Sequence, residues 1–330
     1  MAHHFESGFM VRKPSWHRLE KAVLRSSPTN WDDARKEAGL DWEVISEPVY
    51  DLSPMGYADP IEGWQKIVRN DKAGVSERVL SIQQSSYHVI KNEQFGSVIN
   101  DVLGIAADED PVVFEALMSL YGGRQIVAVC YFEEPLSLSW DPSKTYRYLV
   151  IISRHDGQGG LRILLTNVRV VCANTLNQAE MIDGRNSGFT IRHTANWKSR
   201  VEEVSRILTA ARGESAKWLE FAEQLAAYKV TGRQRETFLK RFMPISDDMS
   251  TKQMVNTEND RDKIRLILSG DSCADIADTG YGLLMASTEW ADHYRSYRSD
   301  DSYIGRQLLL KQAPKARAAA VLRSMAKVKD

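Results

Sequence analysis

The residues that could carry out covalent chemistry in this 330-residue chain are few. Cys172 could act as a nucleophile with His155 as its base, because a thiolate needs a nearby proton acceptor. The apolar residues around the cysteine recur at helical spacing, with Val168, Val171 and Ala179 on its side of a helix. Unreactive cysteine is among the most buried residue types. We therefore interpret Cys172 as a packed core thiol on a helix that directly follows a strand.

Two further pairs of residues have the types that bind metal ions. His155 and Asp156 stand together in a Gly-rich stretch, and Glu289 and His293 share a face if their segment is helical. The same residues also have structural interpretations, because Asp and Gly are common in turns and an i, i+4 pair stabilises a helix. The sequence favours these structural roles and predicts no cofactor. A metal site assembled by the fold from all four residues remains the alternative.

Two segments concentrate positive charge. Residues 229–241 carry five Lys or Arg against one acid, and residues 306–330 carry seven against Asp330 alone. Such segments could track a phosphate backbone, although runs of charge are also typical of solvated helix faces. The candidate phosphate contacts in these segments are Arg233, Arg235, Lys240, Arg241, Lys315 and Arg317.

A second group of candidates comes from expected strands and the turns between them. Tyr148 could stack on a base, although most tyrosines in sheets simply pack against neighbouring strands. Arg169 and Asn174 lie near the start of the expected helix, where free backbone N–H groups attract anions. The remaining candidates for contacts to nucleic acid are Arg124, Arg147, Arg154 and Arg162.

Composition limits the classes of protein that fit. The formal net charge is −1, so any affinity for nucleic acid must come from local charge. Three widely spaced cysteines fit reduced thiols, and no run of 18 apolar residues occurs, which predicts a cytoplasmic protein that does not enter the membrane. Phosphate loops, GxSxG elbows and HExxH helices do not occur in the sequence. We therefore expect a protein without catalytic activity.

The middle of the chain has the pattern of a sheet. β-branched and aromatic residues, several of them alternating with period two, predict strands at residues 41–50, 78–90, 114–121, 124–132, 145–153 and 161–166. Gly122 and Gly123 predict a two-residue hairpin turn, and residues 154–160 are expected to join the last two strands as an antiparallel pair. Residues 92–104 have helical spacing and end on Gly104, which predicts a helix across the sheet.

After residue 194 the apolar period becomes helical. A stripe from Val201 to Leu225, interrupted near Gly213, predicts a helix pair or one kinked helix. Residues 260–270, 279–298 and 315–329 predict further helices. The expected fold class is α+β, with a curved, mostly antiparallel sheet and packed helices followed by a helical C-terminal half. We expect an N-terminal arm over residues 1–40, an α+β core over 41–194 and a helical region with a basic tail over 195–330.

Several ordered segments resemble a known family. RVVCANTLNQA at residues 169–179, together with HDG at 155–157, IRHTANWKSRVEE at 191–203 and ASTEWADHYR at 286–295, is similar to the phage/plasmid-like protein family. PSWHRLE at 14–20 and LYGGRQIVAV at 120–129 extend the resemblance, although Arg18 stands where the family has Gly. The family has no established activity. Its mobile-element setting and its order of sheet and helices resemble the phage single-strand annealing proteins RecT and Red beta.

Together these patterns predict a protein of a phage or plasmid that binds single-stranded nucleic acid. The resemblance further implies a role in recombination or annealing, carried out by a homo-oligomer. Two alternatives remain open from the sequence. One is a metal-assisted enzyme acting on nucleotides or nucleic acid, and the other is a host-interaction protein without catalysis.

Overall fold

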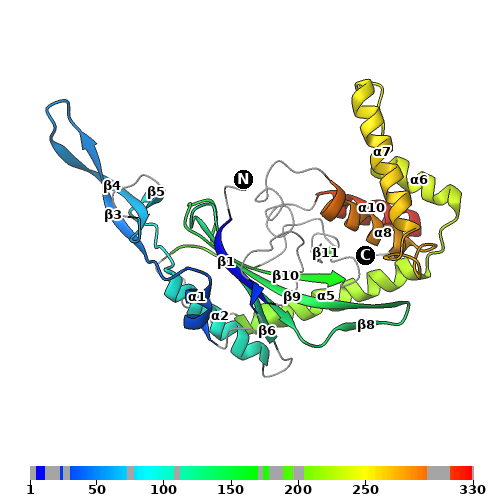
Figure 1. The fold of residues 1–330 in the computed structure, drawn as a ribbon, viewed down its shortest axis with the longest axis horizontal. Helices are drawn as coiled ribbons and strands as arrows, with labels where there is room; N and C mark the ends of the chain where they lie inside the picture. Colours follow the sequence, from blue (N-terminus) through cyan, green and yellow to red (C-terminus); the bar gives the residue numbers. More distant parts are fainter. Residues whose placement is uncertain are drawn as a thin grey trace.

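A computed structural model provides the three-dimensional structure of the chain. It describes residues 5–11, 23–24, 30–72, 78–107, 112–169, 174–177, 189–194, 196, 204–295 and 313–328. The fold has a large sheet, a smaller sheet that projects from it and a cluster of helices (Figure 1).

The main sheet is mostly antiparallel. Its strands run in the order β11-β10-β9-β7-β6-β1-β2, with β12 paired to β10 and β8 paired to β9. Only β1 and β2 pair in parallel among the described strands. The strands are β1 (Phe5–Val11), β2 (Val23–Leu24), β6 (Val112–Leu120), β7 (Gln125–Phe132), β8 (Leu136–Leu138), β9 (Asp141–Arg154), β10 (Leu161–Arg169), β11 (Asn174–Asn177) and β12 (Phe189–Ile191).

Both faces of this sheet are apolar, because successive residues of a strand point to opposite sides. One face packs against α1 (Trp31–Glu37) and α2 (Asn92–Ala107) and forms the first core, which includes Ile126, Ala128 and Leu149. The opposite face forms a second buried cluster of strand residues, which includes Val127, Val129 and Tyr148. The middle strands are therefore buried on both sides.

A smaller sheet of three strands projects from the main body. It consists of β3 (Val44–Leu52), β4 (Ala58–Arg69) and β5 (Val79–Gln84), which pair in the order β3-β4-β5. We call these three strands the arm. Figure 1 shows the β3–β4 hairpin extending beyond β5 to one end of the molecule. The base of the arm is buried at Ile67 and Val68, whereas its tip is exposed.

The helical half has its own core. α8 (Gly280–Glu289) is buried from Gly280 to Thr288 and packs against α5, α7, α10 and β11. A hydrophobic helix that is buried all round is typical of the centre of a helical cluster. The other elements are α5 (Val204–Ala227), α6 (Gly232–Phe242), α7 (Thr251–Leu268), α10 (Ala313–Ala326) and the π-helical turn η2 (Trp290–Tyr294).

The α+β fold class is confirmed, with antiparallel sheets followed by a helical C-terminal half. The hairpin at Gly122 and Gly123 is also confirmed, but its loop has four residues between Leu120 and Gln125. Tyr121, Gly122 and Gly123 all have positive φ, so the turn uses one more residue in the left-handed region than the glycines alone suggest. The antiparallel pair formed by β9 and β10 is as expected.

The expected helix at residues 169–179 is wrong wherever the structure describes this segment. Val168 and Arg169 belong to β10, and residues 174–177 form β11, with Arg169 paired to Asn174 across an antiparallel ladder. A run of valines and a Thr satisfies both the strand pattern and a helical spacing over so short a length. Cys172 lies outside the described residues.

Other differences concern boundaries and missed strands. α2 continues past Gly104 to Ala107, and α5 passes through Gly213 as one element. β4 was not predicted, because Pro60 and Gly63 interrupt its alternation. Residues 5–11 were expected in the N-terminal segment of residues 1–40, separate from the sheet. They form β1 and pair with β6 inside the main sheet.

Candidate nucleic-acid interface

α6 presents a row of cations to solvent. Thr231 caps the helix, with its hydroxyl accepting from the N–H of Gln234 and the Gln234 side chain accepting from the N–H of Thr231. This capping box fixes where the helix begins. Phe238, Leu239 and Phe242 then face the core of the helical half.

The opposite face of α6 carries Arg233, Lys240 and Arg241, which are all exposed. Their spacing of i, i+7 and i+8 places them on one side of the helix, along about 12 Å of its axis. Among the described residues, none of the three makes an ion pair with a carboxylate. We call this surface the α6 face.

The single acid of α6 is hydrogen-bonded by a neighbouring helix. Glu236 accepts two hydrogen bonds from Arg265 of α7, at 3.0 and 2.6 Å. These hydrogen bonds are the largest cause that lowers the pKa of Glu236, and the charges of Arg265, Lys240 and Arg235 lower it further. Arg235, another candidate from the sequence, is half-buried and lies away from the row of exposed cations.

Lys315 does not behave as a surface cation. Its ammonium lies 2.5 Å from the Asp292 carboxylate, and both side chains are only 3% exposed. The pair joins α10 to η2 inside the helical half. A buried ammonium held by a carboxylate is a structural element, so Lys315 is an unsuitable phosphate contact.

Arg317 lies two residues further along α10 and is exposed. α10 packs against α6, so Arg317 places further positive charge on a neighbouring helix, and exposed Lys327 follows the end of that helix. Arg323 instead lies over the ring of Phe221, with its guanidinium carbon 5.0 Å from the ring centroid. The basic segments of the sequence therefore contain both exposed cations and cations used for packing.

The arginines of the main sheet do not form one surface. Arg147 is half-buried on the face that contains Leu149 and lies over the ring of Phe132, at 4.6 Å. Arg162 is half-buried and pairs with Ile152 across the ladder, so it lies on the opposite face. Arg124 is exposed in the β6–β7 turn.

Tyr148 is 6% exposed and lies beside Tyr131, with ring centroids 5.7 Å apart. Tyr131 also contacts Tyr146 edge to face. This packing supports the structural interpretation of the sheet tyrosines, because a buried ring has no free face for a base. The side chains of Arg169 and Asn174 lie outside the described set, and their expected helix N-terminus is replaced by a strand pair.

The described part of the chain provides no support for the alternative of a metal site. No group of three or more His, Cys, Asp or Glu side chains there could hold a metal ion. Asp156 is engaged by Arg154, which donates to both of its carboxylate oxygens at 3.0 and 2.5 Å. Glu289 ends α8 and His293 belongs to η2, whereas His155 and Asp156 follow the end of β9.

His155 is completely buried, and neither nitrogen of its ring has a hydrogen-bond partner among the residues that the structure describes. Burial, with a further contribution from nearby His193, lowers its pKa to about 3, so the ring is neutral near pH 7. Its backbone joins the arm to the main sheet, because the Ser81 hydroxyl donates to its carbonyl at 2.6 Å. These features indicate a structural role for His155 where the arm joins the main sheet.

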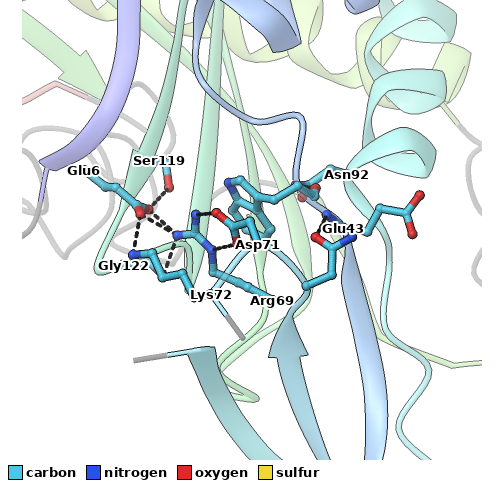
Figure 2. Close-up of polar contacts among 10 residues, drawn as sticks. Glu6, Glu43, Arg69, Asp71, Lys72, Asn92, Ser119 and Gly122 are labelled. Carbon is cyan, nitrogen blue, oxygen red and sulfur yellow. Dashed lines mark hydrogen bonds and ion pairs between the residues drawn. The ribbon is translucent and has the colours of Figure 1, made fainter. Parts of the chain in front are cut away.

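A charged network that the sequence did not predict holds the base of the arm (Figure 2). Arg69 is 3% exposed and donates to both oxygens of Glu6 at 2.5 and 2.6 Å and to both oxygens of Asp71 at 2.9 and 2.7 Å. Lys72 and Ser119 also donate to Glu6, each at 2.9 Å. The guanidinium lies 4.0 Å from the centroid of the Trp42 ring.

This network joins β1, β4 and β6, which are distant in sequence. Burial opposes ionisation of Glu6, but the hydrogen bonds from Arg69, Lys72 and Ser119 hold its pKa below the ordinary value. Burial likewise opposes the charge on Arg69, but its bonds to Asp71 and Glu6 raise its pKa. Because each charge is matched, we regard this site as the anchor of the arm rather than as a binding site.

Comparisons with known proteins identify one family. The model of a family described as a domain of unknown function, DUF932, matches residues 79–313, which is more than half of the chain. No curated protein and no solved structure matches the chain. No helix in the described ranges is both long and apolar enough to cross a membrane.

Proposed function

We propose that this chain, which belongs to the DUF932 family, binds single-stranded nucleic acid through the α6 face. The observation that carries the proposal is the row of exposed Arg233, Lys240 and Arg241, none of which is paired with a carboxylate among the described residues. Cations in this state attract the phosphates of a nucleic acid backbone and release its counterions on binding.

The surroundings of other cations support this choice. Arg69, Arg154, Arg261 and Arg265 all donate to carboxylates within the chain. Such pairing uses the charge for structure. The α6 face is different, because its one acid is already engaged by α7 and its cations point to solvent. Exposed Arg317 on the adjoining α10 would extend the positive surface.

The preference for single strands comes from the resemblance to phage single-strand annealing proteins, and with it come a role in recombination and an origin in a phage or plasmid. The charge pattern alone supports contacts to phosphates. Contacts of this kind position a strand without reading its sequence. We therefore expect binding that depends weakly on base sequence and strongly on salt.

The test is a titration of single-stranded and duplex DNA and of single-stranded RNA at several salt concentrations. The variant Arg233→Ala, Lys240→Ala, Arg241→Ala should bind more weakly and flatten the plot of log affinity against log salt by about 2, since each phosphate contact contributes about 0.7 for single strands. A matched control replaces three exposed lysines elsewhere, Lys36, Lys91 and Lys144, with Ala and should keep the wild-type slope.

Wild-type protein that binds no nucleic acid at low salt, where attraction is strongest, would contradict the proposal. Tighter binding to duplex than to single strands would retain the α6 face as a phosphate-binding surface and reject the preference for single strands. Equal losses in the variant and in the matched control would mean that binding follows net charge rather than this face.

A further inference from the structure

The tip of the arm exposes an unusual amount of apolar surface. We call residues 50–64 the arm tip; they run from β3 through the hairpin turn to Trp64, the first residue of β4 that pairs with β5 (Figure 1). Met55 is 85% exposed and Leu52 is 73% exposed. The large apolar side chains exposed there are Tyr50, Leu52, Met55, Tyr57, Ile61 and Trp64. Exposed apolar patches of this kind on a polar surface mark contacts with other molecules.

The arm tip has a defined backbone. Ser53 and Tyr57 close the turn through two hydrogen bonds, one from the N–H of Ser53 to the carbonyl of Tyr57 and one from the N–H of Tyr57 to the Ser53 hydroxyl. Gly56 has φ +83, which suits glycine at this corner. An isolated two-stranded ribbon is only marginally stable in water, so a partner that covers its apolar side chains would stabilise it.

Proline in both strands of the hairpin, β3 and β4, argues against extension of this sheet by a partner strand. Pro48 lies in β3, at one edge of the arm, and Pro60 lies in the part of β4 beyond its pairing with β5. Proline cannot donate a backbone hydrogen bond and protects edge strands from pairing. The contact we infer therefore uses side chains on the faces of the hairpin.

The charge of the arm tip restricts the partner. Asp51, Asp59 and Glu62 are its only charged residues, and all three are exposed. Asp51 and Asp59 are directly opposite each other across the two strands, an arrangement that is unfavourable without a nearby cation. Three carboxylates repel phosphates, which argues against nucleic acid at this surface. The complementary partner has exposed cations and apolar groups.

The α6 face of the same chain has this composition. Arg233, Lys240 and Arg241 supply exposed cations, and Ile245, 40% exposed, follows the end of α6. Figure 1 shows the arm tip and α6 at opposite ends of the molecule, so they cannot meet within one chain. A contact between them must join two copies.

We propose that the arm tip of one copy docks on the α6 face of a second copy. The two surfaces differ, so the contact is head to tail, and its repetition produces a ring or a filament. Apolar side chains of the arm tip would lose contact with water, and its three carboxylates would approach the cations of α6. Nucleic acid, if it binds to the same cations, would compete with this contact. The self-association itself does not depend on the proposed function.

Sedimentation of nuclease-treated full-length protein tests the proposal. We expect mass to increase with protein concentration at low salt and to fall as salt screens the contact. Two variants reverse the charges: one carries Asp51→Lys, Asp59→Lys and Glu62→Lys, and the other carries Arg233→Glu, Lys240→Glu and Arg241→Glu. Each variant alone should be monomeric, because its arm tip and its α6 face then have the same sign of charge.

An equimolar mixture of the two variants should associate again, because each arm tip then meets an α6 face of opposite charge. This recovery also shows that both variants are folded. A control with Glu37→Lys, Asp101→Lys and Glu133→Lys changes three exposed acids outside the arm and should associate like wild type. Wild-type protein that stays monomeric at low salt and high concentration, or variants that do not recover on mixing, would overturn the proposal.

Further variants separate this proposal from the proposed function. Neutralising the arm tip with Asp51→Asn, Asp59→Asn and Glu62→Gln should weaken self-association and leave the binding of single-stranded DNA intact or stronger. If Tyr57→Ala and Trp64→Ala instead weaken DNA binding and leave self-association unchanged, the arm tip contacts nucleic acid and the docking proposal is wrong. Wild-type protein that self-associates as expected but binds no nucleic acid would reject only the proposed function.

Discussion

The base of the arm and the α6 face both contain arginine, but the surroundings of the arginines are opposite. Arg69 is buried, stacks on Trp42 and donates to two carboxylates and a carbonyl. Arg233 and Arg241 are exposed, and no carboxylate among the described residues pairs with them. In the first arrangement, carboxylates within the fold neutralise the charge. In the second, the charge is available to another molecule. Pairing and exposure therefore distinguish the two roles, whereas residue type does not.

The helical half contains both arrangements within one helix. Lys315 and Arg317 are two residues apart in α10, yet Lys315 is buried against Asp292 and Arg317 is exposed. This pair offers the sharpest test of the comparison, because the two cations share a helix and a sequence context.

Lys315→Met should lower the free energy of unfolding by about 4 kcal/mol, because it leaves the buried Asp292 carboxylate without its ammonium partner. Urea unfolding followed by circular dichroism measures the change. Arg317→Met is the matched control and should change stability by less than about 0.5 kcal/mol. Adding Asp292→Leu to Lys315→Met should recover part of the loss, since the buried carboxylate is then removed as well. Equal effects of the two single variants would contradict the comparison.

Arg69→Leu should lower the free energy of unfolding by about 3 kcal/mol. This effect should be smaller than that of Lys315→Met, because Glu6 and Asp71 are partly exposed and water can solvate them once the guanidinium is gone. Glu6 would keep its contacts to Lys72 and Ser119. Arg35→Leu is a suitable control, because Arg35 makes only a 3.8 Å ion pair with exposed Asp32. The same urea unfolding measurement applies. A loss no larger than that of the control would show that the network does not anchor the arm.

The pH dependence of stability should reveal His155. Its pKa is lowered in the folded protein, so between about pH 6.5 and about pH 3 the unfolded chain binds a proton that the folded chain does not. Stability therefore should fall as the pH falls through this range, by up to about 1.4 kcal/mol per pH unit for one group. His155→Leu should reduce the slope between pH 6.5 and pH 5, above the titration of most carboxylates.

His88→Leu, which replaces an exposed histidine, is the control for this measurement. A His155→Leu slope equal to that of wild type would show that another group governs acid sensitivity. His193, whose pKa burial also lowers, is the group to replace next.

Much of the main sheet was predictable, because its strands are buried on both faces and read as runs of β-branched and aromatic residues. The arm was harder to predict. Its β4 strand contains Pro60 and Gly63, which weaken the pattern, although the turn residues Pro54 and Gly56 between aromatic residues were a usable hairpin signal. The helix expected at residues 169–179 failed because a short segment rich in valine fits both periods, and the pairing of Arg169 with Asn174 is a tertiary outcome.

The sites, like the fold, were only partly predictable from the sequence. Local density of Lys and Arg directed attention to α6, yet the sequence could not separate exposed Arg233 from half-buried Arg235 without knowing where the helix begins. The partners of Arg69 and Lys315 could not be found by pattern at all. Glu6 lies 63 residues from Arg69, and Asp292 reaches Lys315 only because η2 and α10 pack together. Long-range pairing of this kind leaves no periodic signal.

The smallest expected effect on stability belongs to the α6 face. Arg233→Ala, Lys240→Ala, Arg241→Ala should change the free energy of unfolding by less than about 0.5 kcal/mol per residue, because exposed side chains without ion pairs contribute little. Part of any loss would come from Lys240 and Arg241, whose charge in the last turn favours the helix dipole. Urea unfolding measures this effect, and the titration with nucleic acid should show a large loss in the same protein. Were this variant to unfold as readily as Arg69→Leu, the α6 cations would be structural, and the distinction between paired and unpaired arginines would fail where it matters most for function.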